Sequence, residues 1–168
     1  GTGKTALVKE VAKECNMPLI IVHASDILSS LSGETEQNIK KIFDNAKETN
    51  SILLFDEADT FLHSRGDSLN KFNDFKVNEF LTQMEEFTGI LFCNTNLPEN
   101  FDKATDRRFN FHVEFDYLTK DGFEILFNSY FENYSISKEQ KDELFKSGNF
   151  TPGDFGTLYK KLKFVSKE

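Results

Sequence analysis

The first five residues, "GTGKT", carry the residue types of a loop that binds phosphate. Gly1, Thr2, Gly3, Lys4 and Thr5 match the second half of the pattern G-x-x-x-x-G-K-[ST] and precede a stretch with helical spacing. Backbone N–H groups and the helix dipole would then face a phosphate. Lys4 would reach the β- and γ-phosphates of a nucleotide, and the Thr5 hydroxyl would bind Mg²⁺. The alternative is a plain turn, because glycines also form turns.

A second group of chemically capable residues lies in "ILLFDEAD", residues 52–59. Here an apolar run ends in two adjacent carboxylates, which are costly unless they meet a cation or water. Strand ends in open parallel sheets are where ligands bind. Asp56 would therefore hold Mg²⁺, and Glu57 would polarise a water that attacks the γ-phosphate. Taken alone, "DE" also fits an exposed acidic turn.

Two further candidates follow along the chain. In "FCNTN", the Asn96 amide would lie beside the same γ-phosphate and orient the attacking water. Asn94 and Asn96 could instead be turn formers before Pro98. In "DRRFNF", Arg107 and Arg108 form an adjacent pair of planar, permanently charged groups suited to a transferring phosphoryl group. The alternative for this pair is solvated surface charge.

Short apolar runs alternate with helical patterns up to about residue 116 and would position these candidates. The runs at 18–24, 51–56, 88–94 and 111–115 predict buried strands. Between them, apolar residues recur at helical spacing over 6–15, 39–46 and 77–87. Strands that alternate with helices favour a parallel sheet covered on both faces. The predicted fold class is therefore α/β, with an αβα core over residues 1–117.

The remaining residues, 118–168, predict a small all-helical second domain. Apolar residues at 123–131 and at 155–162 form two helical stripes. Between them "SKEQ" has the form of a capping box, with Ser137 followed by Gln140, and opens another helix that ends near Gly148. Thr151 can cap the last helix with Pro152 at its first position.

In order and spacing, "GTGKT", "LLFDEAD", "NTNLPENFD" and "RRF" resemble the AAA ATPases of the AAA+ superfamily of P-loop NTPases. The resemblance covers nearly the whole chain and is similar in style to spastin, katanin and small bacterial AAA proteins. It implies ATP and Mg²⁺ as ligands, ATP hydrolysis, and a homo-oligomeric ring, usually a hexamer. It also implies a protein substrate or adaptor that is remodelled or threaded through the ring.

The resemblance further implies roles for individual residues. Asp56 and Glu57 would be the Walker B pair, and Asn96 would be the first sensor. Arg107 and Arg108 would be arginine fingers that act on the ATP of the neighbouring subunit, with the register between them open. "TPGDFGTLYKKL" resembles the family's lid helix, in which residues 152 and 153, here Pro and Gly, stand by the nucleotide.

Two departures from the family pattern matter. In "SSLSGETE", Leu31 occupies the place of the aromatic residue that grips an extended polypeptide in the pore loop. The family's central strand, which would precede the phosphate loop, is missing from the sequence. We therefore expect a piece of a longer protein, with either a sheet gap between the strands at 51–56 and 111–115 or a rearranged pairing that closes it. By itself, such a piece is not expected to be a competent ATPase.

Bulk composition narrows the function classes. The net charge of -8 and the pI near 5.0 argue against a nucleic-acid surface, which needs a basic face. No apolar run approaches the ~18 residues that a membrane helix needs. Cys15 and Cys93 are expected to be reduced core thiols of a cytoplasmic protein. Two alternatives to a protein-remodelling ATPase stay open: a nucleotide-gated scaffold without effective turnover, and a P-loop protein of another class, such as a motor acting on nucleic acid.

Overall fold

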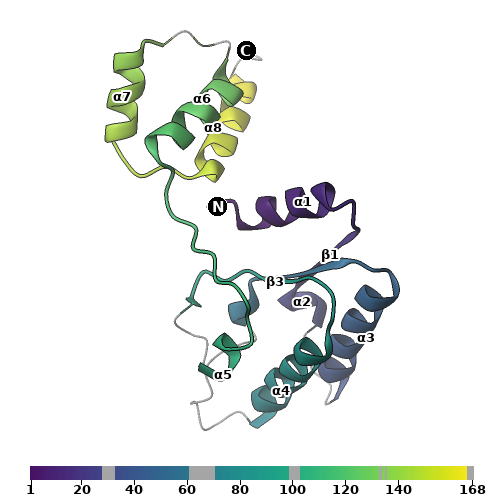
Figure 1. Cartoon of the computed structure of the whole chain (residues 1–168). Coiled ribbons are helices and arrows are strands. Elements are labelled where there is room, and N and C mark those ends of the chain that lie inside the picture. The colour runs from purple at the N-terminus through teal and green to yellow at the C-terminus, as the bar shows by residue number, and fades with distance from the viewer. Residues whose placement is uncertain (28–32, 61–70, 99–102, 133, 135, 166–168) are drawn as a thin grey trace. The chain divides into compact units, whose positions relative to one another are not determined.

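The computed structural model describes residues 1–27, 33–60, 71–98, 103–132, 134 and 136–165 (Figure 1). These residues form two compact units, one made of Thr5–His112 and the other of Gly1–Lys4 with Val113–Glu168. The predicted division into residues 1–117 and 118–168 stays a prediction. The elements, in chain order, are α1 (Lys4–Glu14), β1 (Leu19–His23), α2 (Ala24–Ile27), α3 (Glu34–Glu48), β2 (Ile52–Asp56), a 3-10 turn (Ala58–Thr60), α4 (Lys71–Glu86), β3 (Leu91–Cys93), α5 (Lys103–Asp106), α6 (Lys120–Phe131), α7 (Lys138–Lys146) and α8 (Pro152–Val165).

The Thr5–His112 unit is built on a parallel sheet with the strand order β1-β2-β3. Leu19 of β1 pairs with Ile52 of β2, and Leu53 of β2 pairs with Leu91 of β3. The first four residues of the middle strand, β2, are fully buried because both faces of the sheet are covered. This confirms the predicted α/β fold and three of the four predicted strands.

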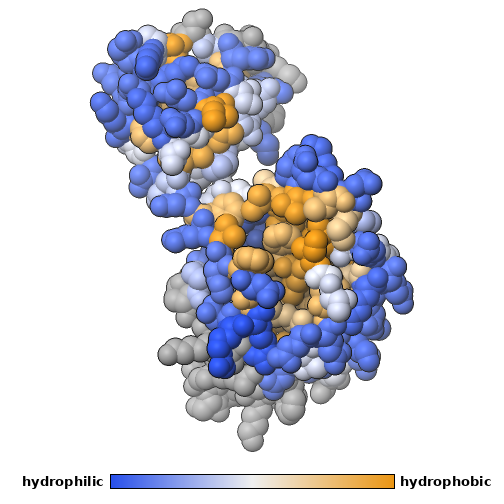
Figure 2. All heavy atoms as spheres, in the orientation of Figure 1, coloured by the Kyte–Doolittle hydropathy of each residue, from blue (hydrophilic) through white to orange (hydrophobic). Residues whose placement is uncertain are grey.

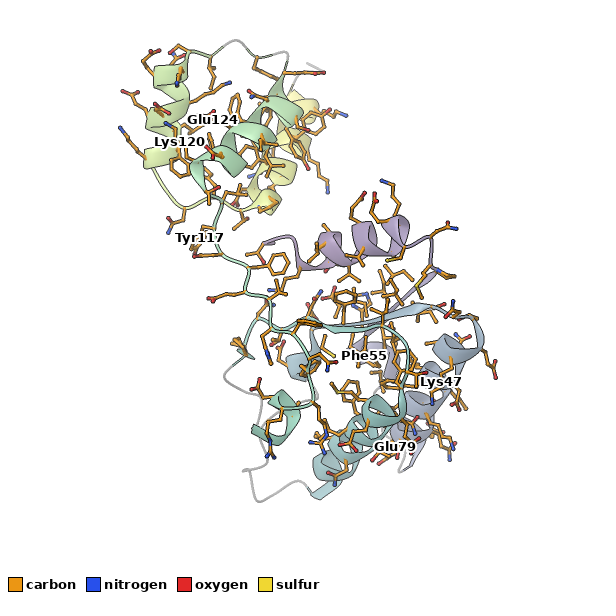
Figure 3. The ribbon with its side chains drawn as sticks, in the orientation of Figure 1. Lys47, Phe55, Glu79, Tyr117, Lys120 and Glu124 are labelled. Atoms are coloured by element: carbon orange, nitrogen blue, oxygen red, sulfur yellow. The ribbon has the colours of Figure 1, made fainter. Side chains whose placement is uncertain are left out.

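Side chains alternate across β2 and so supply two separate apolar clusters. Leu53 and Phe55 face α3 and α4, where the Phe55 ring lies 5.6 Å from Phe43 and 4.8 Å from Phe80, measured between ring centroids (Figure 3). Ile52 and Leu54 face α1 on the opposite side of the sheet. In Figure 1, α3 and α4 accordingly cover one face of the sheet and α1 covers the other. This three-layer packing fixes the carboxyl end of β2.

The fourth predicted strand, at 111–115, is wrong. These residues have no strand pairing, and Phe111 and Val113 are 86% and 68% exposed. An extended apolar segment becomes a strand only when a neighbouring strand accepts its hydrogen bonds, and among the described residues none does. The expected gap beside residues 51–56 is also wrong, because β2 pairs with β1 along one edge and with β3 along the other.

Apolar side chains remain at the surface of the Thr5–His112 unit. Figure 2 shows them gathered between α1 and α4. The exposed large apolar residues of this unit include Leu7, Ile90 and Phe111. The described residues therefore leave part of the apolar surface of this unit exposed to solvent.

The second unit confirms the three predicted helices α6, α7 and α8. Their core is aromatic and consists of Phe123, Phe127, Phe131 and Phe155. The capping box at the start of α7 is present: the Gln140 N–H donates to the Ser137 hydroxyl, and the Ser137 N–H donates to the Gln140 side chain. Lys120 of α6, labelled in Figure 3, pairs with Asp142 of α7 at 2.7 Å. This pairing raises the pKa of Lys120 and lowers the pKa of Asp142.

Two expectations about cysteines and membranes can be compared with the structure. Both cysteines are free thiols. Burial raises the pKa of the Cys93 thiol well above its usual range, whereas Cys15 is exposed at the end of α1, so the expectation of two core thiols is wrong for Cys15. Among the described residues, no helix is both long and apolar enough to cross a membrane.

Candidate functional site

Two of the predicted site residues meet at the carboxyl edge of the sheet. Thr5 lies in the first turn of α1, and Asp56 is the last residue of β2. The Thr5 hydroxyl donates to Asp56 Oδ2 at 2.8 Å, although 51 positions separate the two residues. A hydroxyl and a carboxylate side by side are hard oxygen ligands, the kind that Mg²⁺ takes in nucleotide sites. Both side chains are only partly buried, so solvent and ions can reach them.

A third side chain joins this pair, and it is not one that we assigned to the site. The Asn94 amide, just beyond β3, donates to Asp56 Oδ1 at 3.1 Å and to the Thr5 hydroxyl at 3.4 Å. It is one of the buried polar residues of the chain. The sequence offered Asn94 only as a turn former, because an asparagine before a proline-containing loop is typical of turns. The available signal was its position at the end of a neighbouring parallel strand.

Glu57 and Asn96 lie in the two turns that follow β2 and β3. Glu57 is exposed and has a left-handed backbone, with φ of 57°, which non-glycine residues rarely adopt. This turn is held by the segment that follows β3, because the Ala58 N–H donates to the Asn94 carbonyl at 2.8 Å. Asn96 is also exposed, and its N–H donates to Asp59 Oδ1 at 3.3 Å. The two turns are thus joined by hydrogen bonds at the edge of the sheet where β2 ends at Asp56.

The beginning of the phosphate-loop sequence belongs to the helical unit. The Gly153 N–H, in the first turn of α8, donates to the Gly1 carbonyl at 3.0 Å. Gly3 has φ of 102°, a conformation open to glycine. A Cβ on Gly3 would lie 3.8 Å from the Pro152 ring. Pro152 and Gly153, which are expected to lie beside the nucleotide, therefore lie against the phosphate-loop sequence within this unit.

The same segment contains a polar atom that fits a phosphate. The Thr2 hydroxyl oxygen is buried, and the described residues offer it no hydrogen-bond partner. Together with the left-handed Gly3, it belongs to a loop whose backbone can cradle an anion. The Thr2 hydroxyl of this unit thus fits a phosphate, and in the Thr5–His112 unit the oxygens of Thr5 and Asp56 fit a divalent cation.

The two predicted arginine fingers differ in their surroundings. Arg108 Nε pairs with Glu85 Oε1 of α4 at 2.5 Å, and the Arg108 side chain is 30% exposed. Arg107, next to it, is an exposed residue. The pore-loop position Leu31 lies outside the described residues; Gly33, with φ of 81°, precedes the first helical residue of α3, Glu34.

Comparison with known proteins places these features in a family. The family model "ATPase family associated with various cellular activities (AAA)" matches residues 1–117. The chain is 38% identical over 122 residues to the ATP-dependent zinc metalloprotease FtsH 2 of Phytoplasma mali, covering 67% of this chain and 18% of that protein. It is 36% identical over 115 residues to the vacuolar protein sorting-associated protein 4 of Dictyostelium discoideum, covering 65% of this chain and 26% of that protein.

A solved structure is similar in fold. The crystal structure of the FIGL-1 AAA domain in complex with ADP matches 92% of this chain and 54% of its own, with a TM-score of 0.74 and 21% identity. At that identity the likeness speaks for the fold alone. The chain spans about a fifth to a quarter of the length of the two relatives above. The match of the family model over residues 1–117 shows that this chain belongs to the AAA family of ATPases.

Proposed function

We propose that the chain is an ATP-binding and ATP-hydrolysing module that acts on a protein partner within an oligomeric ring. The observation that carries the proposal is the contact between the Thr5 hydroxyl and the Asp56 carboxylate at the sheet edge. It brings the end of the phosphate-loop sequence to the acidic strand end, which is the pairing that magnesium-nucleotide chemistry requires. Family membership and the ADP complex of the FIGL-1 AAA domain support the proposal.

In this proposal each residue type has one task. The backbone N–H groups of residues 1–5 and the Lys4 ammonium hold the phosphates, while Thr5 and Asp56 hold the cation. A Mg²⁺ ion held by these two residues would supply positive charge to neutralise the phosphoryl oxygens. Glu57 accepts a proton from the attacking water, and the Asn96 amide orients that water. Pro152 and Gly153 contribute to the wall of the nucleotide site.

The proposed function includes a division into two domains and an oligomeric state. Residues 1–117 would form the nucleotide-binding core and residues 118–168 a lid. Arg107 and Arg108 would act on the ATP of a neighbouring subunit, which requires a ring, here a homohexamer in the cytoplasm. Arg107 is exposed whereas Arg108 pairs with Glu85 of the same chain, which favours Arg107 as the arginine that crosses the boundary.

The first test measures phosphate release by the full-length protein and by its Glu57→Gln variant. Loss of a general base costs about 100- to 10,000-fold in rate, so turnover should fall by that factor while the affinity for a fluorescent ATP analogue stays within twofold. Equal losses of affinity and rate would assign Glu57 a structural role. Stimulation by an unfolded protein and not by DNA is expected; stimulation by DNA alone would favour a nucleic-acid motor, and nucleotide binding without turnover a scaffold.

A second test addresses action between subunits. A variant with Arg107 and Arg108 both changed to Ala should bind nucleotide but not hydrolyse it. Mixed with the Glu57→Gln variant, it creates neighbours in which an intact Glu57 meets intact arginines, and part of the activity should return. If mixed rings form and stay inactive, the arginines do not act on the neighbouring subunit.

A further inference from the structure

Asn94 occupies a position from which it contacts both proposed cation ligands. The last paired residues of the two neighbouring strands are Phe55 of β2 and Cys93 of β3. One residue further, Asn94 lies beside Asp56 at the carboxyl edge of the sheet. The parallel register therefore places an amide next to the carboxylate without any contribution from loop conformation.

The three side chains at this edge form a closed set of hydrogen bonds. Thr5 Oγ1 donates to Asp56 Oδ2 at 2.8 Å, so the hydroxyl oxygen is left as an acceptor for Asn94. The amide nitrogen of Asn94 also donates to the other carboxylate oxygen, Oδ1, at 3.1 Å. The nitrogen must face Asp56 in this arrangement, because an amide oxygen there would repel the carboxylate. Both oxygens of Asp56 are thus held, one by each neighbour.

The main chain of Asn94 is fixed as firmly as its side chain. Its N–H donates to the Phe55 carbonyl at 2.9 Å, and its carbonyl accepts from the Ala58 N–H at 2.8 Å. These bonds reach the residue before Asp56 and the residue after Glu57. Asn94 is only 8% exposed, so solvent does not compete strongly for its polar groups. One residue therefore holds both the carboxylate and the turn that presents Glu57.

We propose that Asn94 is a positioning residue of the nucleotide site: it acts through Asp56 and Thr5 to set the geometry in which the divalent cation of a magnesium nucleotide binds. The inference rests on the proposed function. A neutral donor suits this task, because it aligns a carboxylate without cancelling the negative charge that attracts the cation. Residues that support metal ligands in this way are worth about 10- to 100-fold in metal affinity.

The test compares Asn94→Ala with wild-type full-length protein in two measurements. The first is the affinity for an N-methylanthraniloyl ATP analogue with Mg²⁺ and with EDTA. The second is the affinity of the nucleotide-bound protein for Mn²⁺, followed by electron paramagnetic resonance. We expect a loss of about 10- to 100-fold in Mn²⁺ affinity, weaker nucleotide binding in Mg²⁺, and EDTA values within twofold of wild type. Turnover should recover at high Mg²⁺.

Two further variants separate positioning from folding. Gln83→Ala removes another buried amide of the same unit, one that bonds to Glu79 within α4, and should leave both measurements unchanged. Asn94→Ser keeps a polar group but is too short to reach Asp56, so it should reproduce the cation defect if Asn94→Ala is unstable. Equal weakening with Mg²⁺ and with EDTA, or unaltered Mn²⁺ affinity in a folded variant, would overturn the inference. If wild-type protein binds no nucleotide under either condition, the proposed function fails and this inference fails with it.

Discussion

Gly153 offers a sharp test of whether the start of α8 must lie against the phosphate-loop sequence. A Cβ on Gly153 would overlap the Gly1 nitrogen and would lie 3.1 Å from the Gly1 carbonyl oxygen, so the Gly1 backbone would have to move. The movement would break the bond from the Gly153 N–H to the Gly1 carbonyl, which contributes about 0.5–1.5 kcal/mol. Alanine gains about 0.8–1.0 kcal/mol over glycine in a helix. These terms nearly cancel, so Gly153→Ala should leave the free energy of unfolding almost unchanged.

Gly156, one turn further along α8, is the matched control. Its Cβ would meet only the Tyr130 hydroxyl, at 3.9 Å, so Gly156→Ala should keep the full gain of about 1 kcal/mol. Thermal melting of the full-length protein should therefore rank Gly156→Ala above both wild type and Gly153→Ala by a few degrees, as expected for ~1 kcal/mol.

Nucleotide affinity separates the two glycines more strongly than stability does. If displacing Gly1 costs one hydrogen bond to a phosphate, worth about 1.5–3 kcal/mol, the Gly153→Ala variant should bind a fluorescent ATP analogue about 10- to 100-fold more weakly. Gly156→Ala should bind it as wild type does. If both variants melt higher and bind alike, the contact between Gly153 and Gly1 has no part in nucleotide binding.

Three further predictions concern folding stability. Phe80→Ala should lose about 3–5 kcal/mol in urea unfolding, because the ring is fully buried against Phe43 and Phe55, whereas Phe111→Ala, at an exposed site, should change less than ~0.5 kcal/mol. Ser137→Ala should lower stability by about 1 kcal/mol through loss of the cap on α7, a loss that Ser137→Asp should largely avoid in the same assay. Hydrogen bonds from the Thr151 N–H and hydroxyl lower the pKa of Asp154, so its stabilising effect is present above the usual aspartate pKa and lost as the pH falls through the lowered value. The difference in melting temperature between wild type and Asp154→Asn should accordingly vanish in acid; a constant difference would contradict this.

The elements that the sequence predicts correctly are those in which local pattern and tertiary packing agree. "SILLFD" is apolar throughout because both faces of β2 are covered, and such a run is legible without a structure. "FHVEF" has similar composition but pairs with no strand in the part of the chain that the structure describes, and pairing is a property of the tertiary arrangement. The four-residue helices α2 and α5 were not predicted, because they are too short to show a helical period.

The candidate site likewise contains residues that the sequence predicts and one that it does not. The proximity of Thr5 and Asp56 follows from two recognisable motifs and from the rule that parallel strands end at one edge. Asn94 could not be separated from its neighbour Asn96 by residue type, since both precede a proline loop and both are typical of turns. What separates them is the register of β3 on β2, in which Cys93 pairs with Phe55. Register depends on the partner strand, so a single segment does not reveal it.

Because Glu57 has a left-handed backbone, thermostability and activity favour different residues at this position. A glutamate at φ of 57° carries a conformational cost on the order of 1 kcal/mol that glycine does not, and asparagine tolerates the same conformation better. Selection of this chain for thermostability alone would therefore enrich Glu57→Gly and Glu57→Asn, and would discard the carboxylate at the same step. Directed evolution of a sturdier variant would need a selection for turnover in every round, or position 57 held fixed in the library.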